Sequence, residues 1–353
     1  MSSLNESFFN HIVEKMTTKR NVFGSVLCVE KGDNTISWVG GAGNIKEDDQ
    51  YFIASVTKLY ITAVIFKLKA ENQLKLEDKI SKYLCDDLIR GIHVMNEKEY
   101  SNDITILQLI SNTSGIPDYF SQKQSNGKKP ALELLNGKDE PWPLEKTLTI
   151  VKTIKPKFRP GQKGKVNYSD TNYQLLGKII EIITGKSIQD VFKKFIFDEL
   201  NLSKTYVYED VKDSIPVPMY YKSKAIHLPN YMASITPEGG IVSTAKETMI
   251  FLKAFFSGYF FPKAEINEMK KWNLNFPPPG LFFYGIGLER LWVPRFITPF
   301  KPIKEILGFW GQSGAFAFFN PETDLYFTGT VNQLSGFGHS AAFKAMIKII
   351  KSI

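Results

Sequence analysis

The segment Phe52-Ile53-Ala54-Ser55-Val56-Thr57-Lys58 places a serine and a lysine three residues apart at the start of a helical stretch that runs to Leu74. This stretch is apolar nearly all round at first, which is typical of a buried helix. Residues three apart on a helix share a face, so the Lys58 amine can accept the Ser55 proton when that amine is neutral. Burial and a helix N-terminus both favour the neutral amine. The segment predicts a nucleophile and its base; the alternative is that Ser55 caps the helix and Lys58 extends to the surface.

The same spacing occurs in two other pairs, Ser125/Lys128 and Ser243/Lys246. Ser125 lies in a polar loop that cannot desolvate a lysine, and an ammonium with a pKa of about 10.4 is no base. Ser243 precedes Thr244 and Glu247, which fit the capping box of a helix start. Of the three pairs, Ser55/Lys58 is therefore the candidate nucleophile and base, and the helix-cap alternative stays open at this point.

The composition describes a globular chain of 353 residues, 43% of them hydrophobic and 23% charged. Its net charge of +8 is spread along the sequence, which argues against a nucleic-acid partner. Cys28 and Cys85 have no metal-ligand spacing, and we expect neither a metal nor another cofactor. The sequence contains no apolar run of about 18 residues, so we expect no membrane span. Residues 1–16 are unlike a signal peptide, so we expect a cytoplasmic protein, or a periplasmic or secreted one if a signal was removed.

Hydrophobic periodicity places strands near both ends of the chain and helices between them. Strands are predicted over Val22–Glu30, Thr35–Val39, Tyr284–Val293, Ala315–Asn320 and Leu325–Val331, with Phe276–Tyr284 as a rigid loop. Helices are predicted over residues 4–16, 55–74, 104–110, 144–154, 171–183, 188–200 and 340–350. We predict an α+β fold in which residues 1–75 and 235–353 form an antiparallel sheet flanked by the terminal helices. Residues 76–234 form an inserted, mainly helical region, and the active site lies between the two.

The order of further motifs resembles that of the penicillin-recognising serine hydrolases, in particular their class C branch. The serine–lysine segment resembles the nucleophile motif of that family. Over roughly residues 22–333 the other motifs follow in the family's order: Ser114-Gly115-Ile116-Pro117-Asp118-Tyr119, Arg159-Pro160-Gly161, Tyr168-Ser169-Asp170, Glu238-Gly239-Gly240-Ile241-Val242-Ser243-Thr244, Tyr284-Gly285-Ile286-Gly287-Leu288 and Gly311-Gln312-Ser313-Gly314. The resemblance implies a β-lactamase/transpeptidase-like fold and hydrolysis through an acyl-enzyme. Such relatives include class C β-lactamases, penicillin-binding D-alanyl-D-alanine carboxypeptidases, D-amino-acid amidases and family VIII carboxylesterases.

The resemblance also assigns roles to individual residues. It implies that Ser55 is the nucleophile, Lys58 its proton partner, and Tyr168 a general base whose pKa is lowered by the nearby ammonium. The family's oxyanion hole implies two backbone N–H groups, here those of Ser55 and Ala315. Asp170, Gln312, Ser313 and Gly314 fall at positions that contact substrate in the family.

Two of these positions depart from the family pattern. Asp170 stands where the family has Asn; when ionised it can only accept hydrogen bonds and would hold Lys58 as a cation, and it also suits the N-cap of the following helix. Gln312 stands where the family has a Lys or His, so the site lacks a cation for a substrate carboxylate. This favours a carboxylesterase-like activity on neutral esters or amides over a β-lactam, D-Ala-D-Ala or D-amino-acid peptide substrate.

Two rival interpretations use the same residues differently. Ser313, Asp324 and His339 follow one another in α/β-hydrolase order, but Ala315 replaces the last glycine of that motif and a strand pattern follows Ser313. Alternatively, the chain is a non-catalytic binding protein that keeps the fold, an interpretation motivated by Asp170 and Gln312. The presence of Ser55, Lys58 and Tyr168 argues for the enzyme.

Overall fold

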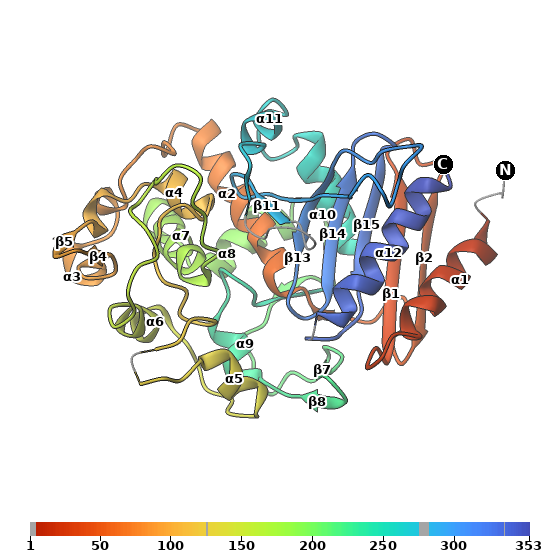
Figure 1. Ribbon diagram of the computed structural model, residues 1–353, viewed down its shortest axis with the longest axis horizontal. Helices are drawn as coiled ribbons and strands as arrows, with labels where there is room; N and C mark the ends of the chain where they lie inside the picture. The colour runs from red at the N-terminus through yellow and green to blue at the C-terminus, as the bar shows by residue number, and fades with distance from the viewer. Residues whose placement is uncertain (1–4, 125, 275–281, 335) are drawn as a thin grey trace.

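The computed structural model describes residues 5–124, 126–274, 282–334 and 336–353. Among these residues, eight strands form one antiparallel sheet in the order β10-β11-β12-β13-β14-β15-β1-β2 (Figure 1). The strands are β1 (Gly24–Lys31), β2 (Ser37–Gly43), β10 (Asn273–Leu274), β11 (Phe282–Tyr284), β12 (Glu289–Leu291), β13 (Ile306–Trp310), β14 (Ala315–Asn320) and β15 (Leu325–Thr330). Because β1 pairs with β15, with Val26 opposite Thr330, the N-terminal hairpin completes a sheet begun by the C-terminal strands.

The central strands are buried on both faces, and their side chains alternate between two hydrophobic clusters. In β14 the small side chains of Ala315 and Ala317 face one cluster, whereas Phe316 and Phe318 face the other. The phenylalanine face is covered by helices α1 (Glu6–Thr17) and α12 (Phe337–Lys351) (Figure 1). The alanine face packs against α10 (Ala245–Ser257) and the turn before α2 (Thr57–Ala70), because small side chains allow close approach.

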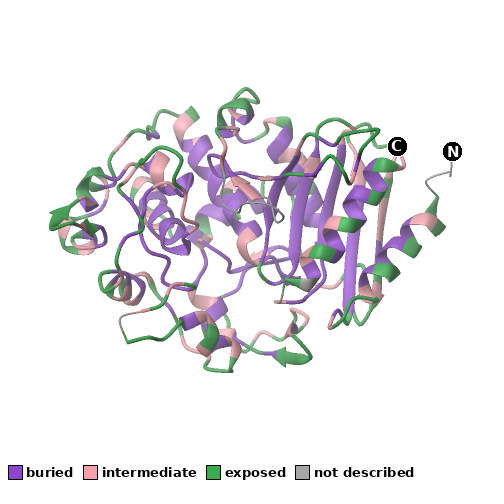
Figure 2. Ribbon diagram, viewed as in Figure 1, coloured by how far each residue is buried: buried purple, intermediate pink, exposed green. Residues whose placement is uncertain are grey.

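The remaining helices form the other half of the molecule, where buried segments run between exposed turns (Figure 2). They are α3 (Asp86–Ile89), α4 (Ile106–Ile110), α5 (Pro130–Leu135), α6 (Leu144–Val151), α7 (Asp170–Thr184), α8 (Ile188–Phe192) and α9 (Pro229–Ser234). Helix α11 (Glu265–Met269) lies instead beside the end of α2, where Lys69 pairs with Glu265. The structure also contains one three-stranded sheet, in which β3 (Tyr51–Phe52) and β6 (Tyr206–Val207) flank β9 (Ile241–Ser243). Two strand pairs complete the described part of the chain: β4 (Val94–Met95) with β5 (Lys98–Glu99), and β7 (Met219–Tyr221) with β8 (Lys224–Ile226).

The predicted α+β class with an antiparallel sheet and terminal helices is confirmed. The division at residues 75 and 235 stays a prediction. As expected, Thr244 caps α10 by accepting from the Glu247 N–H. The Glu247 carboxylate does not complete the box, because it accepts from Lys204 and Thr205 instead. In the described part of the chain, no helix is long and apolar enough to cross a membrane.

Some local predictions were wrong. The single strand over Tyr284–Val293 is two strands, β11 and β12, because Gly287 at φ +66° turns the chain back between them. Strand β13 was missed, since its glycine interrupts a short apolar run. Of the loop predicted over Phe276–Tyr284, residues 276–281 lie outside the described residues and the rest is strand β11.

Candidate active site

Ser55 lies on a short 3-10 turn, Ala54–Val56, immediately before α2. The turn follows β3, and its approach is fixed by a hydrogen bond from the Ile53 N–H to the Ile241 carbonyl at 3.0 Å. Ala54 has φ +46°, a left-handed conformation that is unfavourable for a residue with a Cβ and marks a constrained position. The alternative in which Ser55 caps the helix is wrong, since Val56 occupies that position and α2 starts at Thr57.

Lys58 is wholly buried, with 0% of its surface exposed, so the alternative in which it extends to the surface is also wrong. Its Nζ donates to Ser55 Oγ at 2.9 Å and to the Glu238 carbonyl at 2.8 Å. The same Nζ lies 2.7 Å from Asp170 Oδ1 and over the rings of Tyr168 and Tyr173. Such a set of partners is what a buried ammonium requires.

Tyr168 lies in the loop before α7, and its hydroxyl donates to Ser55 Oγ at 2.8 Å. The ring packs against Tyr284, with 5.4 Å between ring centroids. The expected lowering of the Tyr168 pKa by an ammonium is wrong, because burial and the neighbouring Asp170 carboxylate raise this pKa well above its usual value. Tyr168 is therefore a phenol at neutral pH, not a phenolate.

Asp170 is the first residue of α7, whose N-cap is Ser169. The proposed N-cap role for Asp170 is therefore wrong; its carboxylate pairs with Lys58 instead. Its backbone N–H donates to the Asp118 carboxylate at 3.0 Å. Two negative side chains thus approach the N-terminus of α7, where the helix dipole favours them.

The loop Gln312-Ser313-Gly314 joins β13 to β14 and docks on the nucleophile segment. Ser313 Oγ donates to the Phe52 carbonyl at 2.7 Å. Gly314 has φ +92°, and a Cβ there would lie 2.9 Å from the backbone nitrogen of Gln333, so the turn requires glycine. Gln312 is exposed and lines the same pocket as Ser55. Ala315 starts β14 directly after this loop.

The rival triad is not assembled. The Ser313 hydroxyl is hydrogen-bonded to the Phe52 carbonyl, and the His339 ring nitrogen contacts the Gly311 carbonyl at 2.9 Å. Asp324 lies in the turn between β14 and β15, against Gly32. Of the other serine–lysine pairs, Ser125 lies outside the described residues, while Ser243 bonds Thr205 and Lys246 pairs with Asp48 and Glu47.

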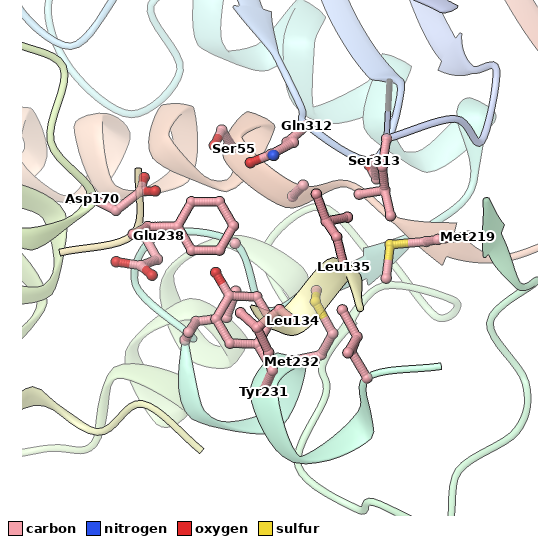
Figure 3. Close-up of a pocket in the computed structure, with 16 residues that line it drawn as sticks. Ser55, Leu134, Leu135, Asp170, Met219, Tyr231, Met232, Glu238, Gln312 and Ser313 are labelled. Atoms are coloured by element: carbon pink, nitrogen blue, oxygen red, sulfur yellow. The ribbon is translucent and has the colours of Figure 1, made fainter. Parts of the chain in front are cut away.

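A largely apolar pocket opens beside Ser55 (Figure 3). Figure 3 shows Asp170 and Glu238 at one end and Met219 at the other. The pocket is lined by Ala54, Ser55, Phe120, Leu134, Leu135, Asp170, Met219, Leu228, Tyr231, Met232, Ile235, Glu238, Gly239, Gln312, Ser313 and Leu334. No local sequence pattern predicted the apolar wall of the pocket, because α5, α9 and β7 come together only in the folded chain.

Sequence reasoning assigned no role to three buried carboxyl groups around the site. The pKa of Asp118 is raised to about 6, chiefly by burial. Glu289 accepts from the backbone N–H of Trp310 at 3.0 Å and hydrogen-bonds to Tyr284. Burial raises the pKa of Glu289 to about 7. Burial and Asp170 raise the pKa of Glu238 well above its usual value. An acidic residue before two glycines was the one available sequence signal for Glu238. Within the described residues, no three His, Cys, Asp or Glu side chains are arranged to hold a metal.

The geometry defines a serine hydrolase-type site, in which a lysine and a tyrosine meet at one serine hydroxyl within an α+β fold. Residues 9–349 match the family model described as Beta-lactamase. The chain therefore belongs to the beta-lactamase family, a superfamily of serine hydrolases that includes penicillin-binding protein homologues, esterases and D-amino-acid amidases.

Individual relatives are distant. Protein flp of Staphylococcus aureus (strain COL) is 26% identical over 208 residues, which cover 58% of this chain and 38% of that protein. The chain thus spans well under half the length of this relative. A D-stereospecific amidohydrolase from Streptomyces sp. has a TM-score of 0.77 at 23% identity, covering 96% of this chain and 98% of the other. D-amino acid amidase from Ochrobactrum anthropi SV3 has a TM-score of 0.79 at 19% identity, covering 99% of both.

The buried Lys58–Asp170 pair predicts strong thermodynamic coupling. Lys58→Ala and Asp170→Ala should each lower the free energy of unfolding by about 3–5 kcal/mol, since each strands a buried charge. The double variant should cost clearly less than the sum. Urea denaturation measures all three, with the exposed pair Lys79–Asp103 as a control whose coupling should stay below about 1 kcal/mol. Additive losses at Lys58 and Asp170 would contradict the pair.

Glu289 predicts a pH dependence of stability. Its pKa is raised from 4.5 to about 7, so the protonated carboxyl stabilises the fold below pH 4.5, and this contribution is lost as the pH rises through about 7. Relative to Glu289→Gln, which cannot titrate, the wild-type free energy of unfolding should fall by about 3 kcal/mol between these limits. Chemical denaturation at a series of pH values measures this. The exposed control Glu14→Gln should parallel wild type, and a parallel Glu289→Gln curve would refute the prediction.

Proposed function

We propose that this chain is a serine hydrolase that forms an acyl-enzyme on Ser55 and acts on neutral esters or amides. The observation that carries the proposal is the convergence of Lys58 Nζ and the Tyr168 hydroxyl on Ser55 Oγ, at 2.9 and 2.8 Å. A serine that is hydrogen-bonded to two proton-carrying groups in a pocket wall has what nucleophilic catalysis requires. A non-catalytic binding relative would not need this arrangement, which argues against that alternative.

The proton path follows from the charges at the site. While Lys58 stays paired with Asp170 it remains a cation and cannot accept the serine proton, but it stabilises negative charge on Ser55 Oγ. Tyr168 is a phenol whose O–H points at Ser55 Oγ, so it acts as a relay once this O–H turns toward the leaving group: its oxygen then takes the Ser55 proton while its own proton passes to the leaving group. In deacylation, water attacks the acyl group: its proton passes to the Tyr168 oxygen while the Tyr168 proton returns to Ser55 Oγ. The backbone N–H groups of Ser55 and Ala315 are the proposed donors to the oxyanion.

The pocket supports uncharged substrates. Gln312 offers only a neutral amide, and no Lys or Arg is among the residues that line the pocket. A β-lactam or peptide C-terminus would bring a carboxylate to a wall that already carries Asp170 and Glu238. Esters and amides without that carboxylate are therefore preferred. The second candidate, hydrolysis of D-amino-acid amides, is favoured by the fold similarity to the Streptomyces D-stereospecific amidohydrolase.

Acylation tests the assignment of the nucleophile. Incubation with a fluorophosphonate should add one adduct to the intact mass of the wild type and none to Ser55→Ala, because the variant lacks the attacking oxygen. A p-nitrophenyl short-chain ester should be turned over faster than a chromogenic cephalosporin, since the cephalosporin carries a carboxylate. An adduct that survives Ser55→Ala would refute the proposal, and much faster cephalosporin turnover would refute the substrate preference.

The relay role of Tyr168 predicts a loss of rate rather than of binding. Tyr168→Phe removes the hydroxyl on Ser55 Oγ but keeps the ring that packs on Tyr284, so kcat for the ester should fall about 10²–10⁴-fold with little change in KM. Steady-state kinetics measure both constants. The same substitution at the exposed Tyr259 is the control and should leave both unchanged. A kcat for Tyr168→Phe within threefold of wild type would contradict the role.

A further inference from the structure

The loop between β12 and β13, residues 292–305, exposes two phenylalanine rings. Phe300 is 99% exposed and Phe296 is 81% exposed, whereas Ile297 and Ile303 of the same loop pack on the hydrophobic cluster beneath α1 and α12. The loop is thus anchored by its isoleucines while its phenylalanines project into solvent. A single exposed apolar side chain is ordinary, but two such rings in one loop form an apolar surface that indicates a contact outside the chain.

Two cations flank these rings directly in the sequence. Arg295 comes immediately before the first ring and Lys301 immediately after the second, and both side chains are exposed. Neither has an ion-pair partner in the described part of the chain, in contrast to Lys304 of the same loop, which pairs with Glu322 at 3.4 Å. The loop therefore presents apolar rings beside uncompensated positive charges.

A stripe of three lysines along α12 continues this positive charge. Lys344, Lys348 and Lys351 are exposed and follow one another at helical spacing, so they share one side of the helix. Nζ of Lys351 donates to the Ile297 carbonyl at 3.4 Å, and this contact joins the end of the lysine stripe to the phenylalanine loop. The rings and the lysines thus belong to one continuous surface.

Helix α1, which lies beside α12 (Figure 1), adds two lysines to this surface. Lys15 and Lys19 line a groove between the two helices together with Lys344 and Lys348, and none of the described residues that line this groove is acidic. Like charges one turn apart destabilise a helix, and here both helices carry such a pair. A repulsion that no side chain of the groove relieves indicates a negatively charged partner.

The combination of rings and cations distinguishes between anionic partners. A bilayer with anionic head groups offers both contacts at once, because its interface takes up aromatic side chains while its surface charge attracts Lys and Arg. A bilayer also needs no matching cavity, which suits rings that project as freely as Phe296 and Phe300. An acidic protein segment would instead follow the lysine groove and leave both rings in water.

We propose that the phenylalanine loop, the lysine stripe of α12 and the two lysines of α1 dock this protein on an anionic lipid surface. Phe296 and Phe300 enter the boundary of the hydrocarbon layer, while the ammonium groups stay among the head groups. The docking surface shares no residue with the pocket beside Ser55, so this inference does not depend on the proposed hydrolase activity.

Co-sedimentation of the full chain with lipid vesicles tests this surface. Wild type should bind phosphatidylcholine vesicles that contain about one third phosphatidylglycerol at least about tenfold more tightly than pure phosphatidylcholine vesicles. Added salt should weaken this binding, because it screens the attraction between lysines and head groups. The double variant Phe296→Ser/Phe300→Ser should lose about tenfold or more in affinity. Lys344→Gln/Lys348→Gln should lose a similar factor and depend less on salt.

Matched controls change exposed side chains outside the docking surface. Leu132→Ser/Ile215→Ser removes two exposed apolar side chains, and Lys163→Gln/Lys165→Gln removes two exposed positive charges. Both controls should bind vesicles as wild type does. Thermal unfolding of every variant confirms that it is folded, which is expected because all the substituted side chains are exposed.

The possible outcomes decide between lipid and other anionic partners. Absence of wild-type binding to the phosphatidylglycerol vesicles, or equal binding to both kinds of vesicle, would overturn the proposal. Unchanged binding of the phenylalanine variant would overturn it as well. If soluble poly-L-glutamate then displaced that variant and wild type equally from the vesicles, the lysine groove would be a site for an acidic polypeptide instead.

Discussion

The burial of one ammonium group, Nζ of Lys58, constrains more of this structure than any other interaction. The charge has no contact with solvent, and a charge in that position is tolerated only if several partners surround it. Those partners come from segments far apart in sequence: Ser55 from the turn before α2, Asp170 from α7, and the Glu238 carbonyl from the segment before β9. The segments around residues 55, 170 and 238 must therefore meet at this nitrogen.

The same requirement explains why parts of the site could be predicted from sequence. Ser55 and Lys58 are adjacent on one turn, so their spacing alone brings them together, and the alternation in β14 fixes its two faces. Tyr168 was placed by its motif, but its protonation state was not, because this depends on Asp170 and on burial. Strand β13 was missed because its glycine interrupts a short apolar run, and the strand is evident only from its pairing with β12 and β14. Long-range packing, which no local pattern encodes, supplied the rest.

Among the described residues, Lys58 is the one buried lysine or arginine, and several buried acids surround it. Asp118, Asp170, Glu238 and Glu289 all lie near the site, and for Asp118, Glu238 and Glu289 burial dominates and raises the pKa. A buried acid whose pKa is raised is harder to ionise in the folded chain, which costs stability at neutral pH, and such costs are characteristic of functional sites. Asp170 is distinguished from the others because it has a cation within 2.7 Å. The site thus contains one ion pair, Lys58–Asp170, and three further buried acids whose pKa values are raised.

The backbone before the nucleophile is held in a constrained conformation that fixes the position of Ser55. Ala54 holds a left-handed conformation directly before Ser55, and this persists because the Ile53 backbone is hydrogen-bonded to Ile241 on one side and α2 is anchored in the core on the other. The turn therefore cannot relax without breaking the sheet or the buried helix. Ser55 Oγ is held in place before any substrate arrives, so little reorganisation is needed on binding. What the pocket selects is then decided by its wall, where Gln312 carries no charge and most of the lining side chains are apolar.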